Sequence, residues 1–204
     1  NLFDFYLAVS RRLDAVSALL TQDPSARHDL AAAMKEAVLN AILHADYFAP
    51  GGLTIRRTDE KLQVENPGLL RVTPDQAKKG GSADPRNRTL TSLFSLVKLA
   101  SGQGLGLKGI YKAWAKQGWN SPTLSEAFQA GIPSLSLPLP RRAFSQEEMT
   151  LQLIVEYLTD EVSAPSEAIA RALGLTEKEV TAALDHLLEE NLIVEQPDGF
   201  HLRA

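Results

Sequence analysis

The sequence predicts an α+β fold, a two-layer α/β sandwich in which helices cover one face of a sheet, followed by a small, separate domain. Helical and strand patterns alternate over the first 140 of the 204 residues, and the charge balance changes sign after them. Residues up to Phe144 hold 18 Lys+Arg and 12 Asp+Glu, whereas those from Ser145 hold 3 and 13. Because this change coincides with the Pro- and Arg-containing segment 138–142, we expect one domain over 1–140 and another over 145–204.

The elements of the first domain follow from the spacing of its apolar residues. Asp23-Pro24-Ser25 breaks the first helical pattern, and Pro50-Gly51-Gly52 makes a turn before the first strand. In chain order the pattern predicts helices over 2–20 and about 27–45, strands over 53–57 and 61–65, helices over about 89–99 and 107–116, and strands over 123–129 and 134–139.

The second helix carries a row of polar residues. Glu36, Asn40 and His44 are spaced four apart and therefore share one helix face. A carboxylate can act as a base, an amide oxygen can ligate a hard cation, and an imidazole can donate to an anion, as a Mg-nucleotide site requires. The alternative is the ordinary polar stripe of an amphipathic helix.

Two further segments could take part in such a site. The second strand ends at Asn66-Pro67-Gly68, which places a polar side chain before a tight turn, although a plain turn is the alternative. Gly102, Gly104 and Gly106 lead into a helix whose N-terminus offers unpaired N–H groups to an anion. Their GxGxG spacing is not a dinucleotide-binding signature, and a flexible linker is the alternative.

The basic, glycine-containing stretch 71–88 is predicted to be a loop. It could close over phosphates, and the alternative is a disordered surface loop.

The motifs EAVLNAILHADY, LQVENPG, DPRNRTLTSLF and GQGLGLKGIYKAW, in this order, resemble a known family. They are similar to the GHKL (Bergerat-like) ATP-binding fold of gyrase, heat-shock chaperones, histidine kinases and MutL. The similarity is greater to the ATP-binding domain of bacterial transcriptional regulators, which are labelled as related to the C-terminal part of the DNA helicase RecG and often carry an AlbA/Schlafen-like domain. It covers about residues 2–139.

The resemblance implies ATP and Mg²⁺ as ligands. Glu36 would take the place of the water-activating carboxylate, Asn40 would hold Mg²⁺ between the phosphates, and His44 keeps its family position on the same helix. Asn66 would read adenine, and Gly68 would give the base room.

The resemblance also implies that Gly102, Gly104 and Gly106 wrap the phosphates with help from Lys108. The chain departs from the family pattern at Ala45, where Arg is usual, and at Asn66, where an Asp is usual. These departures leave nucleotide affinity, base preference and turnover open.

The acidic C-terminal domain predicts a winged helix-turn-helix, which its sequence also resembles. The pattern gives helices over 146–160, 166–173 and about 177–190, the last with Thr176 and Glu179 as a capping box, and a hairpin over 192–194 and 199–202. Lys178, Thr181 and Arg203 are the candidate DNA contacts after dimerisation. A net charge of −10 opposes DNA binding, so a domain used for protein contacts or homodimerisation is the favoured alternative on charge.

Three function classes stay open: a nucleotide-responsive transcriptional regulator, an ATP-hydrolysing enzyme, and a degenerate dimerisation module. No GxxxxGK[ST] motif occurs, so the chain is not a helicase motor by itself. The absence of cysteine and of a long apolar run fits a cytoplasmic protein without a membrane span, and the missing initial Met suggests a fragment of a longer chain.

Overall fold

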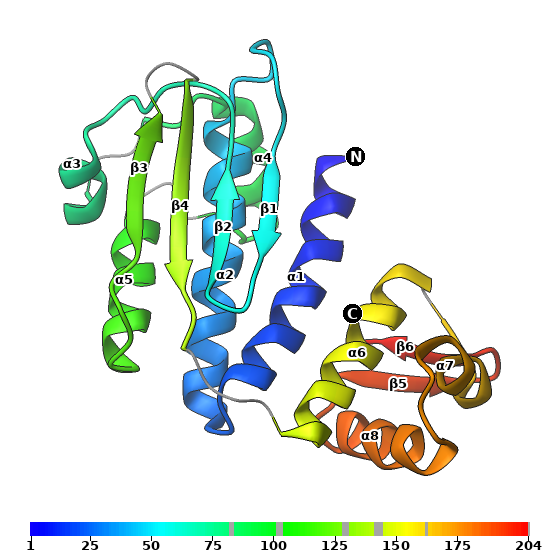
Figure 1. The fold of residues 1–204 in the computed structure, drawn as a ribbon. Coiled ribbons are helices and arrows are strands. Elements are labelled where there is room, and N and C mark those ends of the chain that lie inside the picture. The colour runs from blue at the N-terminus through cyan, green and yellow to red at the C-terminus, as the bar shows by residue number, and fades with distance from the viewer. Residues whose placement is uncertain (82–83, 101–103, 128–130, 141–144, 162, 204) are drawn as a thin grey trace. The chain divides into compact units, whose positions relative to one another are not determined.

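The computed structural model describes residues 1–81, 84–100, 104–127, 131–140, 145–161 and 163–203 (Figure 1). The chain forms two compact units. The sheet unit comprises Asp23–Arg141, and the helical unit comprises Phe3–Gln22 together with Arg142–Ala204. The predicted α+β class is confirmed. The first helix, which we expected to belong to the sheet domain, instead groups with the C-terminal residues.

The sheet unit contains a four-stranded antiparallel sheet with the strand order β1-β2-β4-β3. Its strands are β1 (Thr54–Arg57), β2 (Lys61–Glu65), β3 (Thr123–Ala127) and β4 (Ile132–Pro138). β2 pairs with β4 so that Leu62 lies opposite Leu137 and Val64 opposite Leu135. These four side chains are buried, because alternate residues of a strand point to the same face. The register therefore gives the sheet one apolar face.

Helices of the sheet unit pack on that face (Figure 1). They include α2 (Pro24–His44), α4 (Arg88–Leu96) and α5 (Gly106–Lys116). α2 starts three residues earlier than expected, because Asp23 accepts the Ser25 N–H and Pro24 fits the first helical turn. Trp114 of α5 is fully buried, and its indole N–H donates to the carbonyl of Pro138, 2.6 Å away. This bond fixes α5 against the end of β4.

The segment 71–88 contains a short helix that sequence analysis missed, α3 (Pro74–Lys79). Thr73 and Gln76 form a capping box at its N-terminus. None of its residues is buried, so it has no apolar periodicity by which a helix could be recognised. The prediction of a loop over this segment was therefore wrong for these six residues.

The described residues of the helical unit form four helices and a hairpin. In chain order these are α1 (Leu2–Leu20), α6 (Gln146–Glu161), α7 (Ser166–Leu173), α8 (Glu177–Glu189), β5 (Ile193–Gln196) and β6 (Gly199–Leu202). The predicted capping box of Thr176 and Glu179 is present at the start of α8. Ala15 and Leu19 of α1 belong to the same buried apolar cluster as Leu158 of α6. This shared core explains why α1 groups with the C-terminal residues.

Candidate functional site

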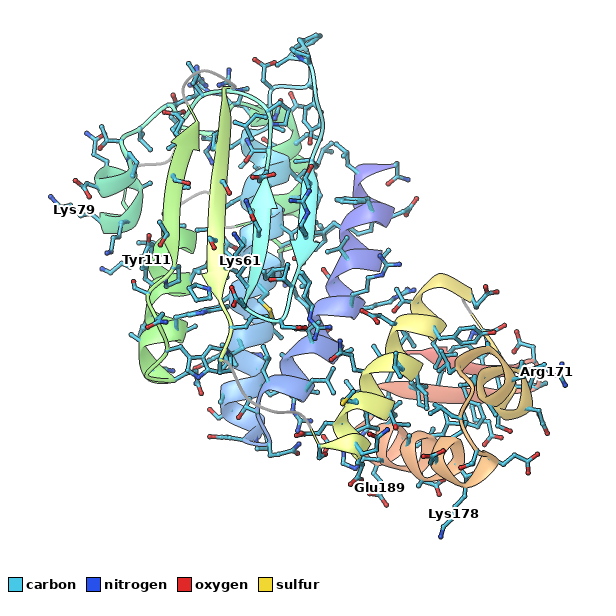
Figure 2. All side chains as sticks on the ribbon, viewed as in Figure 1. Lys61, Lys79, Tyr111, Arg171, Lys178 and Glu189 are labelled. Carbon is cyan, nitrogen blue, oxygen red and sulfur yellow. The ribbon has the colours of Figure 1, made fainter. Side chains whose placement is uncertain are left out.

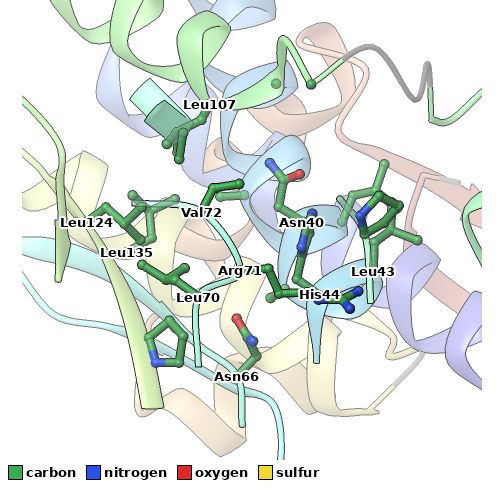
Figure 3. Close-up of a pocket in the computed structure, with 18 of the residues that line it drawn as sticks. Asn40, Leu43, His44, Asn66, Leu70, Arg71, Val72, Leu107, Leu124 and Leu135 are labelled. Atoms are coloured by element: carbon green, nitrogen blue, oxygen red, sulfur yellow. The ribbon is translucent and has the colours of Figure 1, made fainter. Parts of the chain in front are cut away.

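A cavity of about 170 Å³ in the sheet unit brings together most of the predicted ligand-binding residues. Figure 3 shows Asn40 and His44 of α2 and Asn66 after β2 around this cavity, with Leu70, Leu124 and Leu135 forming an apolar wall. The predicted residues that line it are Glu36, Asn40, His44, Asn66, Gly68, Gly104 and Gly106. A mainly apolar cavity with a few convergent polar groups is the usual form of a small-molecule site.

Two predicted residues are not among those lining the cavity. Gly102 lies outside the described residues. Lys108 is exposed in the first turns of α5, two residues after the cavity-lining Gly106.

Glu36 and Gly106 lie in direct contact. A Cβ added to Gly106 would be 1.8 Å from Oε1 of Glu36 and 2.6 Å from its Cδ. In the described part of the chain, the N-cap residue of α5, Leu105, makes no side-chain capping hydrogen bond, and Gly106 is the first helical residue. Its backbone therefore presents a helix N-terminus beside a carboxyl group, and only glycine allows this close approach.

Burial raises the pKa of Glu36 to about 7, while a side-chain hydrogen bond with Asn40 partly opposes this rise. A carboxyl group that titrates near neutral pH is suited to general base catalysis. Burial also lowers the pKa of His44, with Asp84 opposing and Arg86 and Arg71 adding to this effect. The imidazole is therefore mainly neutral at pH 7, and in that form one ring nitrogen still donates.

The raised pKa of Glu36 predicts a pH-dependent stability. Because the unfolded carboxyl loses its proton at lower pH than the folded one, the free energy of unfolding should fall as pH rises from about 4.5 to 7. The Glu36→Gln variant should lack this loss, which amounts to about 3 kcal/mol at most. Urea denaturation of both proteins at pH 5 and pH 7.5 measures it. Identical pH profiles would contradict the burial of an ionisable Glu36.

Asn66 is buried where the chain leaves β2, and its side-chain amide donates to the carbonyl of Pro67 at 3.3 Å. Gly68 has a φ of +100°, and its N–H donates to the carbonyl of Gly131 at 2.9 Å. A Cβ at Gly68 would be 2.7 Å from Cβ of Asp46. The turn therefore needs glycine for both its backbone conformation and its close packing.

Asn87, just before α4, closes the C-terminus of α2. Its amide Nδ2 lies 2.7 Å from the carbonyl oxygen of Ala45, 3.1 Å from that of Leu43 and 3.4 Å from that of Ile42. Its backbone N–H also donates to Leu43 at 3.0 Å. The last carbonyls of a helix have no partner within the helix, so this side chain satisfies groups that would otherwise need water.

Arg86 connects the same helix end to the turn after β2. Its Nη2 donates to the carbonyl of Leu69 at 2.9 Å, and its Nε donates to the carbonyl of His44 at 3.3 Å. Its Nη1 lies 3.5 Å from the carboxylate of Asp46. Arg86 and Asn87 thus fix α2, which carries the polar row, relative to Asn66 and Gly68.

Replacement of Asn87 by alanine should destabilise the sheet unit by about 1–3 kcal/mol, because buried carbonyls of α2 would lose their donors. Asn120→Ala is the matched control, since Asn120 is exposed. Its effect should stay within about 0.5 kcal/mol. Chemical denaturation measures both changes, and equal stabilities of the two variants would show that the Asn87 contacts contribute nothing.

Arg71 and Asp84 line the cavity but were not selected from the sequence. Nε of Arg71 lies 3.2 Å from Oδ2 of Asp84, and its Nη1 donates to Oδ1 at 3.3 Å. Figure 3 shows Arg71 next to His44. No sequence pattern pairs two residues that are thirteen positions apart and lie on either side of α3, although the resemblance included Asp84 in its DPRNR motif.

The candidate DNA contacts of the helical unit do not form one surface. Lys178 and Thr181 are exposed near the start of α8. Arg203, after β6, donates to Oδ1 of Asn191 at 2.5 Å, and Asn191 follows the end of α8. Lys178 and Glu189, the last residue of α8, are eleven positions apart, which corresponds to about 16 Å of helix, so Arg203 is held at the opposite end.

The described residues hold no group of three or more His, Asp or Glu side chains arranged for a metal ion. A Mg²⁺ ion at Asn40 would take phosphate oxygens of a bound ligand as further partners, as Mg²⁺ in nucleotide sites commonly does. The oxygen donors of Asn40 and Glu36 and the glycine contact at Gly106 fit such an ion–phosphate pair. Throughout the described ranges, no helix has the length and apolar character to cross a bilayer.

Residues 51–130 match a family described as "Putative ATP-dependent DNA helicase recG C-terminal". No curated protein matches the chain. A similar solved structure is the DIP2311 protein from Corynebacterium diphtheriae, with 20% sequence identity and a TM-score of 0.49 over 85% of this chain. The matched part covers 40% of that protein's chain, so this chain spans about two fifths of it. The chain is therefore similar to this family over residues 51–130, which is less than half of its length.

Proposed function

We propose that the sheet unit is a GHKL-type domain that binds ATP with Mg²⁺ in the cavity beside α2. The observation that carries this proposal is the contact of the half-buried Glu36 carboxyl with the glycine-lined start of α5. It brings the polar row of α2 to the segment that the resemblance assigns to the phosphates. The family match over residues 51–130 supports the same ligand.

Each part of the cavity has a chemically suitable partner on the nucleotide. Leu70, Leu124 and Leu135 give the base an apolar wall, and the Asn66 amide can both donate to and accept from it. The backbone of Gly104 and Gly106 would receive the phosphates at the α5 N-terminus. Arg71 would approach the anionic part if its pairing with Asp84 opens, which adds a cation that the missing arginine at Ala45 does not supply.

Mg²⁺, when bound, would neutralise phosphate charge, and the Asn40 oxygen would hold it in place. Glu36 would orient a water molecule and accept its proton, because its pKa lies near 7. A base at the position of Glu36 favours a second candidate function, slow ATP hydrolysis. The raised pKa also means that part of Glu36 is protonated at neutral pH, which limits the rate.

We further propose that α6, α7, α8 and the β5–β6 hairpin form a winged helix-turn-helix, and that the protein is a homodimeric, nucleotide-responsive transcriptional regulator. The order of helices, the capped α8 and the hairpin support this assignment. The charge of −10 after Phe144 and the separation of Lys178 from Arg203 favour protein contacts over DNA contacts for this unit.

A thermal-shift titration with ATP, with and without Mg²⁺, tests nucleotide binding. We expect a saturable rise in melting temperature that requires Mg²⁺, because a ligand that binds only the folded state stabilises it. No rise with any nucleotide would leave the degenerate dimerisation module as the function. Phosphate release that disappears in Glu36→Ala would establish the ATPase, whereas binding without release would favour the regulator.

A further inference from the structure

The helices α3 and α5 carry an unusual excess of positive charge. Together their residues include five lysines and a single carboxylate, Asp75. We call the five the lysine face: Lys78, Lys79, Lys108, Lys112 and Lys116. All five are exposed. This charge lies in the part of the chain that has a balance of +6, and the excess of acidic residues lies after it.

Three lysines form a line along α5. Lys108, Lys112 and Lys116 are four residues apart, so they share one side of the helix and follow each other at a rise of about 6 Å. The exposed residues between them include Gly109 and Ala115, which have little or no side chain. A Cβ at Gly109 would meet no atom within 4 Å. Small residues leave this side of α5 accessible to an extended ligand.

The lysines of α3 lie close to this line because α3 packs on α5. Nζ of Lys78 lies 4.5 Å from the ring centroid of Tyr111, and the N–H of Gly81 donates to the carbonyl of Gly104 at 3.1 Å. Figure 2 shows Lys79 extending outward from α3, on the side of the sheet unit where Tyr111 of α5 lies. The lysines of α3 and α5 therefore belong to one region of the surface.

The carboxylates near this region neutralise only part of it. Lys116 pairs with Asp29 of α2, with Nζ 2.5 Å from Oδ2, and this bond lowers the pKa of Asp29, with a smaller contribution from the charge of Lys112. Asp75 lies in the first turn of α3, whereas Lys78 and Lys79 lie in its last turn. The positive excess is consequently centred on Lys79, Lys108 and Lys112.

We propose that the lysine face binds the phosphate backbone of nucleic acid without reading its sequence. A lysine ammonium is a compact charge that pairs with a phosphate and offers no planar fork to select a base. The sheet unit, and not the acidic helical unit, then makes the contact with nucleic acid. This proposal does not depend on nucleotide binding, since neither Lys79 nor Lys112 lines the cavity.

The test is the anisotropy of a fluorescent 30-base-pair duplex titrated with the full chain between 50 and 200 mM salt. We expect the logarithm of the association constant to fall linearly with the logarithm of the salt concentration. In the double variant Lys79→Gln/Lys112→Gln the slope should become shallower by about two, because two phosphate contacts are lost. Affinity at 0.1 M salt should fall roughly tenfold or more.

The matched control is Arg11→Gln/Arg171→Gln, which removes the same charge from the helical unit. Both side chains are exposed, and Figure 2 shows Arg171 pointing into solvent. The control should keep the slope and affinity of the unchanged protein. No binding at 50 mM salt, or an equal loss in both double variants, would overturn the proposal. Salt-sensitive self-association that only Lys79→Gln/Lys112→Gln removes, without duplex binding, would also overturn it and assign the face to an acidic protein surface.

Discussion

Gly106→Ala is expected to abolish Mg-nucleotide binding and to destabilise the sheet unit by about 1–3 kcal/mol. The new Cβ would be 1.8 Å from Oε1 of Glu36, so either the carboxyl or the first turn of α5 must move. Both groups belong to the proposed phosphate end of the cavity. Chemical denaturation gives the loss of stability, and calorimetry with Mg²⁺ and a non-hydrolysable ATP analogue gives the loss of binding.

Two variants separate this clash from a general effect of alanine on α5. Gly109→Ala adds the same atom to the same helix in open space, and it should raise stability by up to about 1 kcal/mol through helix propensity. Glu36→Ala combined with Gly106→Ala removes the clashing carboxyl and should restore most of the lost stability. A Gly106→Ala protein as stable as Gly109→Ala would show that the contact with Glu36 does not constrain the helix.

Asn40→Ala is expected to remove Mg-dependent nucleotide binding. Its amide oxygen is the proposed protein ligand of Mg²⁺, and its side chain also bonds with Glu36. Replacing a residue that only orients a metal ligand commonly costs 10–100-fold, so loss of the ligand itself should cost about 100-fold or more. Calorimetry with and without Mg²⁺ measures the change, with Asn120→Ala as the control. Unchanged affinity in Asn40→Ala would remove this residue from the site.

Much of the fold followed from local patterns. The strand 61–65 and the end of the helix at Lys116 were predicted from periodicity alone, because alternation and helical spacing are encoded residue by residue. α3 was not predictable in this way, since it buries nothing. The unit on which α1 packs was not predictable either. An apolar stripe such as the one that contains Ala15 and Leu19 shows that a helix packs against something, but not against which unit.

The candidate site also contains residues that local patterns predict and residues that they do not. The row from Glu36 to His44 could be predicted because its residues lie on one helix, and Asn66 because it ends a strand. The pairing of Arg71 with Asp84 and the closure of α2 by Asn87 depend on contacts between irregular segments. Side chains in such segments have no period, so only the three-dimensional structure brings them together.

The cavity beside α2 is the proposed binding site for Mg-ATP. A crystal structure of the chain with Mg²⁺ and a non-hydrolysable ATP analogue tests it most directly. We expect the base at Asn66 and Gly68, the phosphates at Gly104 and Gly106, and Mg²⁺ on the Asn40 oxygen. A cavity without nucleotide at saturating analogue, or a nucleotide bound elsewhere on the chain, would contradict it.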